Sequence, residues 1–332
     1  MLGQIYKIYS DSYFVKINAV VVSCKIREIL KKQKISIVTG DFVEVEDNVI
    51  TKILPRKTFI KRPAVANVDQ VVVVSALKEP ELNFNQLNRY ISLAKYYKIP
   101  VILCFNKDDL EYEIGLQDKI ENIYAKLGYK IAYTSAKEKN GIDYLFKLLS
   151  GKLSALCGNS GVGKSSLINA LCPDINLKTQ SVSEKLNKGT HTTRHCEIID
   201  AGENVRIIDT PGFSNLKFDF ILPKDVDYLF DEIYMYKNKC KYSDCLHINE
   251  ADCEVLKNID SIDRTRYESY LEFLKEAFEY KEKVKYNGKK SETYKKLHNN
   301  KSVVKISSKK RQGSRNTQKQ KIYKELDKNE DE

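Results

Sequence analysis

Residues 158–165 read Gly-Asn-Ser-Gly-Val-Gly-Lys-Ser, which matches the pattern G-x-x-x-x-G-K-[ST] of a phosphate-binding loop. An apolar strand pattern over Lys152–Cys157 precedes the loop, and a helical pattern begins near Lys164. Glycines let backbone N–H groups and the helix N-terminus approach phosphate oxygens. Lys164 is expected to contact the β- and γ-phosphates, and Ser165 to bind Mg²⁺. The expected phosphate-binding residues are therefore Gly158, Asn159, Ser160, Gly161, Val162, Gly163, Lys164, Ser165 and Ser166.

Two further motifs precede this loop, and each follows a strand pattern, where α/β folds place ligand-contacting loops. They are Asn106-Lys107-Asp108-Asp109 and Ser135-Ala136-Lys137. A carboxylate at Asp109 can accept hydrogen bonds from N1–H and the exocyclic amino group of guanine, which adenine cannot offer together. GTP or GDP is therefore the predicted ligand, and a P-loop ATPase or kinase is disfavoured. The expected guanine-loop residues are Asn106, Lys107, Asp109, Ser135, Ala136 and Lys137.

Asp209-Thr-Pro-Gly212 follows the phosphate loop and ends an apolar strand pattern. Asp209 is expected to hold Mg²⁺ through water, and the N–H of Gly212 to meet the γ-phosphate. An ordinary small GTPase has its phosphate loop first and its guanine motifs last. The order found here predicts a circularly permuted GTPase.

Residues 189–195, Gly-Thr-His-Thr-Thr-Arg-His, lie where a GTPase places the mobile loop that reaches Mg²⁺ and the γ-phosphate. Thr193 is the expected ligand, with Thr192 as the second candidate. Phe213 stands where many GTPases have the Gln that orients the attacking water, so His191 is the available polar group; a structural role for His191 is the alternative. The expected catalytic residues are His191, Lys164 and Thr193, and we expect slow turnover that a partner accelerates.

The hydrophobic pattern divides the chain into domains. Residues 1–54 carry five short β-rich runs, which fit an OB-fold that binds oligonucleotides or an SH3-like barrel without a ligand. From residue 69, apolar strand patterns alternate with helical stretches at 83–98 and 115–128, which predicts a doubly wound parallel sheet.

A cluster of metal-ligand residues follows, in the pattern Cys240-x4-Cys245-x-His247-x5-Cys253. Three thiols and one imidazole form the ligand set of a closed structural zinc site, and unpaired thiols are the alternative. The helical run 261–283 after it carries Tyr267, Tyr270, Leu271, Leu274 and Phe278 at core spacing, so we expect these side chains to pack.

Composition narrows the class of protein further. The chain has 332 residues, enough for two or three domains, and its eight cysteines follow no signal peptide or long apolar stretch. We expect a reduced, cytoplasmic protein.

Residues 287–332 hold 14 Lys and Arg against 6 Asp and Glu, so +8 of the net charge of +11 lies in this tail. Such a tail is expected to be disordered and either attracts polyanions such as RNA or is merely solvated.

Together these motifs resemble one family, the RsgA family of circularly permuted GTPases that depend on the small ribosomal subunit. The resemblance covers about residues 1–286 and also includes Arg62-Pro63 and Ala66–Gln70. It implies an α/β plus all-β protein with an OB-fold RNA-binding domain (1–62), a circularly permuted P-loop GTPase domain (63–222), a zinc-binding domain with helices (223–286) and the basic tail (287–332).

The resemblance also implies a function: ribosome-stimulated GTP hydrolysis in late maturation of the small (30S) subunit, with rRNA bound and the protein released on hydrolysis. It implies His191 as the residue that assists hydrolysis. The expected cofactors are GTP or GDP, Mg²⁺ and one structural Zn²⁺. We expect a monomer with the small subunit and its rRNA as partners and with neither membrane nor DNA. The alternative is a GTP-switched RNA-binding module with little turnover.

Overall fold

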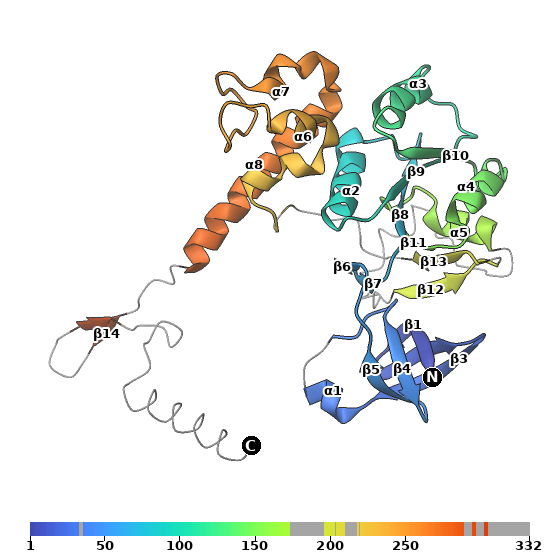
Figure 1. Cartoon of the computed structure of the whole chain (residues 1–332). Helices are drawn as coiled ribbons and strands as arrows, with labels where there is room; N and C mark the ends of the chain where they lie inside the picture. The colour runs from blue at the N-terminus through green and yellow to red at the C-terminus, as the bar shows by residue number, and fades with distance from the viewer. Residues whose placement is uncertain are drawn as a thin grey trace. The chain divides into compact units, whose positions relative to one another are not determined.

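The structure is a computed structural model that describes residues 1–32, 36–172, 196–202, 204–209, 218, 220–288, 294–296 and 302–304 (Figure 1). Its chain divides into two compact units, residues 1–277 and 278–332. No helix in these described ranges is both long and apolar enough to cross a membrane.

The N-terminal segment folds into a five-stranded barrel (Figure 1). Its elements are β1 (Leu2–Tyr9), β2 (Ser12–Ile17), β3 (Val20–Ile26), α1 (Glu28–Lys32), β4 (Phe42–Glu46) and β5 (Val49–Ile53). The strands pair in the order β1-β2-β3-β5-β4, and β4 pairs again with β1, which closes the barrel. Alternate residues such as Ile5, Val15, Val43 and Ile50 fill its interior. The barrel is OB-like, as the family resemblance implies.

A six-stranded sheet forms the core of the central region. Its strands are β8 (Gln70–Ala76), β9 (Val101–Asn106), β10 (Lys130–Thr134), β11 (Leu153–Cys157), β12 (Glu197–Asp200) and β13 (Arg206–Asp209). They lie in the order β10-β9-β8-β11-β13-β12, and only β12 runs antiparallel to its neighbour in this group. The carboxyl ends of the parallel strands therefore gather the predicted motifs at one edge.

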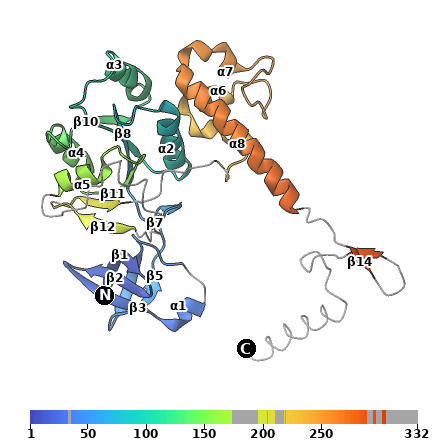
Figure 2. The ribbon, with the colours of Figure 1, turned by 180° about the vertical axis from the view of Figure 1, so that it is seen from behind.

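Helices cover both faces of this sheet, which confirms the doubly wound prediction. They are α2 (Phe84–Tyr96), α3 (Leu116–Ile120), the π-helix η1 (Glu121–Ala125), α4 (Ile142–Leu149) and α5 (Lys164–Leu171). α2, α3 and η1 bury their apolar residues in one core, and α4 and α5 in another. Figures 1 and 2 show α2 on one side of the strands and α4 with α5 on the other.

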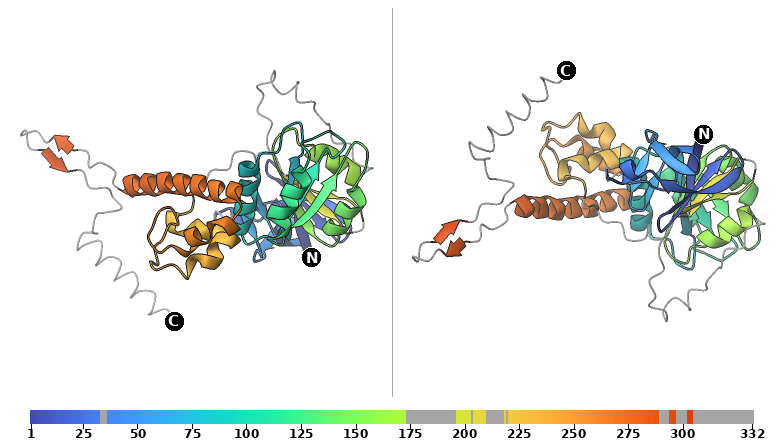
Figure 3. Two further views of the ribbon diagram at one scale, coloured as in Figure 1. Left: turned by 90° about the horizontal axis from the view of Figure 1, so that it is seen from above. Right: turned by 90° about the horizontal axis from the view of Figure 1, so that it is seen from below.

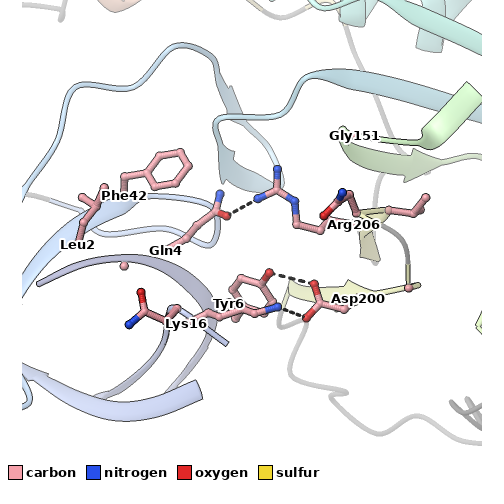
Figure 4. Close-up of a pocket in the computed structure, with 13 residues that line it drawn as sticks. Leu2, Gln4, Tyr6, Lys16, Phe42, Gly151, Asp200 and Arg206 are labelled. Carbon is pink, nitrogen blue, oxygen red and sulfur yellow. Dashed lines mark hydrogen bonds and ion pairs between the residues drawn. The ribbon is translucent and has the colours of Figure 1, made fainter. Parts of the chain in front are cut away.

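The barrel joins the central sheet along its edge strand. β1 pairs with β12 at Lys7 and Glu197, whose side chains also form an ion pair of 2.7 Å. Asp200 at the end of β12 accepts a hydrogen bond from the Tyr6 hydroxyl (3.0 Å) and pairs with Lys16 (2.6 Å) (Figure 4). These contacts border a cleft of about 690 Å³. A hairpin of β6 (Phe59–Lys61) and β7 (Ala64–Ala66) links barrel and sheet in the chain, and the predicted boundary after residue 62 falls within it.

The C-terminal region has short helices packed on one long helix (Figure 3). They are η3 (Pro223–Asp225), η4 (Asp227–Leu229), α6 (Asp231–Lys237), α7 (Glu254–Lys257), η5 (Ile259–Ser261) and α8 (Arg264–Gly288). Tyr270 and Leu274 are fully buried, as predicted, and Tyr267 and Leu271 pack at the edge of the core. Phe278 is 37% exposed, so its predicted core position is wrong.

The basic tail contains one described pair of strands, β14 (Tyr294–Lys296) and β15 (Ser302–Val304), which run antiparallel. The expected disorder of the remaining tail stays a prediction, because that part lies outside the described residues.

Candidate nucleotide-binding site and metal centre

The phosphate loop occupies the turn between β11 and α5, and two of its glycines are fixed by close neighbours. A Cβ atom at Gly158 would lie 2.0 Å from the carbonyl oxygen of Val74. A Cβ atom at Gly163, where φ is +92°, would lie 2.2 Å from Nδ2 of Asn106. Only glycine fits these positions, so the loop backbone runs tightly against β8 and the first guanine motif.

Asn106 joins the phosphate loop to both guanine motifs. Its side chain is buried, and its Nδ2 donates to the carbonyl oxygen of Val162 in the phosphate loop (2.9 Å). Its Oδ1 accepts hydrogen bonds from the backbone N–H of Ala136 (3.1 Å) and from the Thr134 hydroxyl (3.2 Å). One amide therefore holds together three motifs that are far apart in the sequence.

The Asp109 carboxylate is oriented by the second guanine motif. The Ser135 hydroxyl donates to Asp109 Oδ1 (2.6 Å) and accepts from the N–H of Glu138 (3.0 Å). Lys107 donates its ammonium to the carbonyl oxygen of Glu79, and Lys137 remains largely exposed. Asp109 thus keeps a second carboxylate oxygen that could accept from a guanine base.

Lys164 is the lysine of the phosphate loop, and Asp209 lies on the strand next to the one that precedes the loop. The Lys164 ammonium donates to the carbonyl oxygens of Gly158 (2.8 Å) and Asn159 (2.7 Å). Asp209 ends β13 and is paired in register with Leu156 of β11. Burial raises the pKa of Asp209, and the positive charge of Lys164 offsets part of that rise. A divalent cation would favour the ionised carboxylate in the same way.

The magnesium donor set is only partly described. Ser165 and Ser166 are half-buried at the start of α5, and Ser160 is exposed on the loop. A serine hydroxyl and an aspartate carboxylate supply the oxygen ligands that Mg²⁺ prefers, so Ser165 and Asp209 fit the ion. The predicted residues His191, Thr192, Thr193, Gly212 and Phe213 lie outside the described residues.

The four predicted zinc ligands come together in the C-terminal region. The ligand atoms of Cys240, Cys245, His247 and Cys253 all lie within 4.8 Å of one another. Nδ1 of His247 is 3.3 Å from Sγ of Cys253 and 3.7 Å from Sγ of Cys240, and these two sulfurs are 3.9 Å apart. Zn–S bonds of about 2.3 Å in a tetrahedron place sulfurs about 3.8 Å apart. The cluster therefore fits one tetrahedral zinc ion.

A carboxylate lies near the second ring nitrogen of the histidine in this cluster. Nε2 of His247 faces away from the sulfurs and lies 3.7 Å from Oδ2 of Asp227, which also pairs with Lys237 (2.6 Å). Both His247 and Asp227 are buried, and Nε2 has no hydrogen-bond partner among the described residues. Metal-binding histidines commonly have such a carboxylate at their second nitrogen. Sequence reasoning missed Asp227, because it lies twenty residues before His247 with no local pattern.

Hydrogen bonds stabilise the loop between Cys245 and Cys253, both within the loop and between the loop and α8. Tyr267 and Tyr270 donate their hydroxyls to the carbonyl oxygens of His247 and Leu246, each at 2.7 Å. Glu250 accepts from the N–H groups of Leu246 (2.7 Å) and Ile248 (2.8 Å). Burial opposes ionisation of Glu250, but these backbone donors outweigh it and lower the pKa of its carboxyl.

Comparison with protein families gives matches over most of the chain. Residues 53–219 match a family described as the RsgA GTPase, and residues 2–51 match the RsgA N-terminal domain. Residues 154–290 match a family described as a 50S ribosome-binding GTPase. That third match begins in β11, directly before the phosphate loop, and leaves out the earlier strands that carry the guanine motifs.

Individual relatives and solved structures agree with these matches. A "Small ribosomal subunit biogenesis GTPase RsgA" of Caldanaerobacter subterraneus is 40% identical, and the match covers 86% of this chain and 98% of the relative. Its namesake in Alkaliphilus metalliredigens is 38% identical over 82% of this chain and 97% of its own. The crystal structure of YjeQ from Thermotoga maritima has a TM-score of 0.73 and 32% identity, covering 83% of this chain and 98% of that one. YloQ, described as a circularly permuted GTPase, has a TM-score of 0.69 and 28% identity, covering 84% and 95%.

Proposed function

Because this chain belongs to the RsgA family of GTPases, we propose that it hydrolyses GTP during maturation of the small ribosomal subunit. The hydrogen bonds of Asn106 carry the proposal, since they bring both guanine motifs to the phosphate loop in a permuted chain. Relatives that match 82% and 86% of the chain bear the name of a small-subunit biogenesis GTPase.

The contacts at the site support a set of residues for GTP binding. Asp109 reads the guanine, Ser135 and Ala136 complete its pocket, and the backbone of residues 158–163 surrounds the phosphates. Lys164 leaves its two loop carbonyls for the β- and γ-phosphates, where its charge stabilises the transition state. Mg²⁺, when held by Ser165, Thr193 and Asp209, neutralises further phosphate charge. His191 positions or activates the attacking water.

The barrel (1–62) and the metal-containing region (223–286) flank the GTPase domain (63–222), and we assign both to binding of rRNA. Zn²⁺ held by the three thiols and His247 fixes the fold of the second region. Some thirty residues separate Asp209 from Cys240, so a change at the γ-phosphate has a short covalent path to the metal centre. If GTP strengthens ribosome binding, the ribosome strengthens GTP binding equally. The protein acts as a cytoplasmic monomer without membrane or DNA partners.

The direct test measures GTP turnover by the purified chain with and without isolated small ribosomal subunits. We expect strong stimulation that is lost in Lys164→Ala and His191→Ala. His195→Ala changes another histidine of the same segment and is expected to keep the stimulation. Absence of stimulation in the unmodified chain, with tight GTP and RNA binding intact, would instead identify a GTP-switched RNA-binding module.

A further inference from the structure

The side chain of Tyr90 on helix α2 contacts the phosphate loop. Its hydroxyl donates a hydrogen bond to Oδ1 of Asn159 at 3.0 Å, across 69 residues of sequence. Tyr90 is only 2% exposed, and burial raises the pKa of its hydroxyl, which therefore stays a protonated donor at neutral pH. The amide of Asn159 is thereby fixed with its oxygen towards α2.

Asn159 is held at its backbone as well as at its side chain. Its carbonyl oxygen accepts a hydrogen bond from the Lys164 ammonium at 2.7 Å. The preceding Gly158 lies so close to Val74 that no side chain fits there. Tyr90 thus anchors a loop residue whose carbonyl oxygen accepts from Lys164 in this structure, before the lysine turns to the phosphates.

Helix α2 is itself held from its other side by α8. Nδ2 of Asn88 donates to the Ser269 hydroxyl (2.9 Å), and Arg89 forms two hydrogen bonds of 2.9 Å with Glu276. Glu276 also accepts from the N–H of Phe218 (2.8 Å), just beyond the Asp-Thr-Pro-Gly segment. Because α8 holds the residues next to Tyr90 on α2, the Tyr90 hydroxyl has a fixed position from which it can orient the loop.

We propose that Tyr90 is a positioning residue for GTP binding, whose hydroxyl holds Asn159 and with it the phosphate loop in the nucleotide-binding shape. This inference rests on the proposed GTPase function. It assigns no chemical step to Tyr90, which acts only through Asn159.

The test compares Tyr90→Phe with Tyr124→Phe in the full chain, by equilibrium titration with GTP and with GDP. Both changes remove one hydroxyl from a buried ring, but the Tyr124 hydroxyl donates to Asn88 (2.8 Å) and does not contact the loop. Loss of one net hydrogen bond corresponds to about a threefold to tenfold weaker affinity, which we expect for Tyr90→Phe. Tyr124→Phe is expected to lower the unfolding midpoint similarly and to leave nucleotide affinity unchanged.

A double-mutant cycle separates positioning from general destabilisation. Asn159→Ala should weaken GTP binding about as much as Tyr90→Phe, and the double variant should be no weaker than Asn159→Ala alone. Unchanged affinity in Tyr90→Phe, or an undiminished loss when Asn159 is already alanine, would overturn the inference. If the unmodified chain bound no GTP, the proposed function itself would fail, whereas GTP binding that is insensitive to Tyr90→Phe would remove only the role of Tyr90.

Discussion

Replacement of Arg266 by methionine tests how much a buried ion pair of the C-terminal region, which also contacts the GTPase domain, contributes to stability. Arg266 on α8 is 1% exposed, and its guanidinium donates twice to Glu232 of α6 (2.6 and 3.2 Å) and once to Oδ1 of Asn88 on α2 (3.0 Å). Burial opposes the charge of Arg266, but the ion pair with Glu232 outweighs this effect and raises the pKa of Arg266.

The expected loss of unfolding free energy can be estimated from the carboxylate that the substitution leaves unpaired. Methionine fills much of the space but leaves the Glu232 carboxylate, on a residue 8% exposed, buried without its cation. Two unit charges about 4 Å apart interact by about 4 kcal/mol at an effective dielectric constant of about 20. Breaking one partner of a buried pair typically costs about 3–5 kcal/mol. We expect Arg266→Met to lower the free energy of unfolding by about this amount, a large part of the stability of a domain.

The assay is urea unfolding followed by far-ultraviolet circular dichroism, because the chain has no tryptophan to report by fluorescence. Arg264→Met on the same helix is the matched control, since Arg264 is exposed and pairs with Glu268 at the surface. Removing both buried charges in Arg266→Met/Glu232→Leu should recover most of the loss. The reasoning is refuted if Arg266→Met is no more harmful than Arg264→Met, or if the double variant is less stable than the single one.

Three further predictions concern the sites and the tail. Asp109→Asn should abolish the preference for GTP in competition with other nucleotides, because an amide cannot accept both guanine donors at one end; a retained preference would contradict the base assignment. Metal analysis of protein purified without chelator should find one zinc per chain, lost in Cys253→Ser; metal-free protein with fully titratable thiols would exclude the zinc centre. Deletion of residues 287–332 should reduce both RNA affinity and its salt dependence, whereas unchanged salt dependence would leave the tail without an electrostatic role.

Sequence reasoning succeeded where a motif is local. The phosphate loop, the two guanine motifs and the Cys/His cluster each lie within a few residues, and their order predicted the permuted GTPase family that the comparisons confirm. The barrel type stayed open at the level of residues, because five short strands fit two folds until their pairing order is known.

Long-range polar contacts could not be predicted in this way. Tyr90 belongs to an amphipathic pattern that any core-facing helix would share, and its partner Asn159 lies 69 residues further along the chain. Arg266 stands in a stretch rich in charge, Arg264-Thr-Arg-Tyr-Glu268, which reads as a solvent-facing helix start. Its burial depends on its partners Glu232 and Asn88, and the residues around Arg266 in the sequence give no sign of either partner.

The pairing of β1 with β12 also affects how readily the molecule can associate with other chains. A sheet normally ends in two strands with unpaired N–H and C=O groups, which can recruit strands from other molecules. Here the barrel occupies one of those ends, and in the described eleven-stranded sheet only β10 keeps a neighbour on a single side. The barrel covers part of this edge through the pair of Lys7 and Glu197, and we expect a chain without its first fifty residues to expose all of β12 to pairing with other chains.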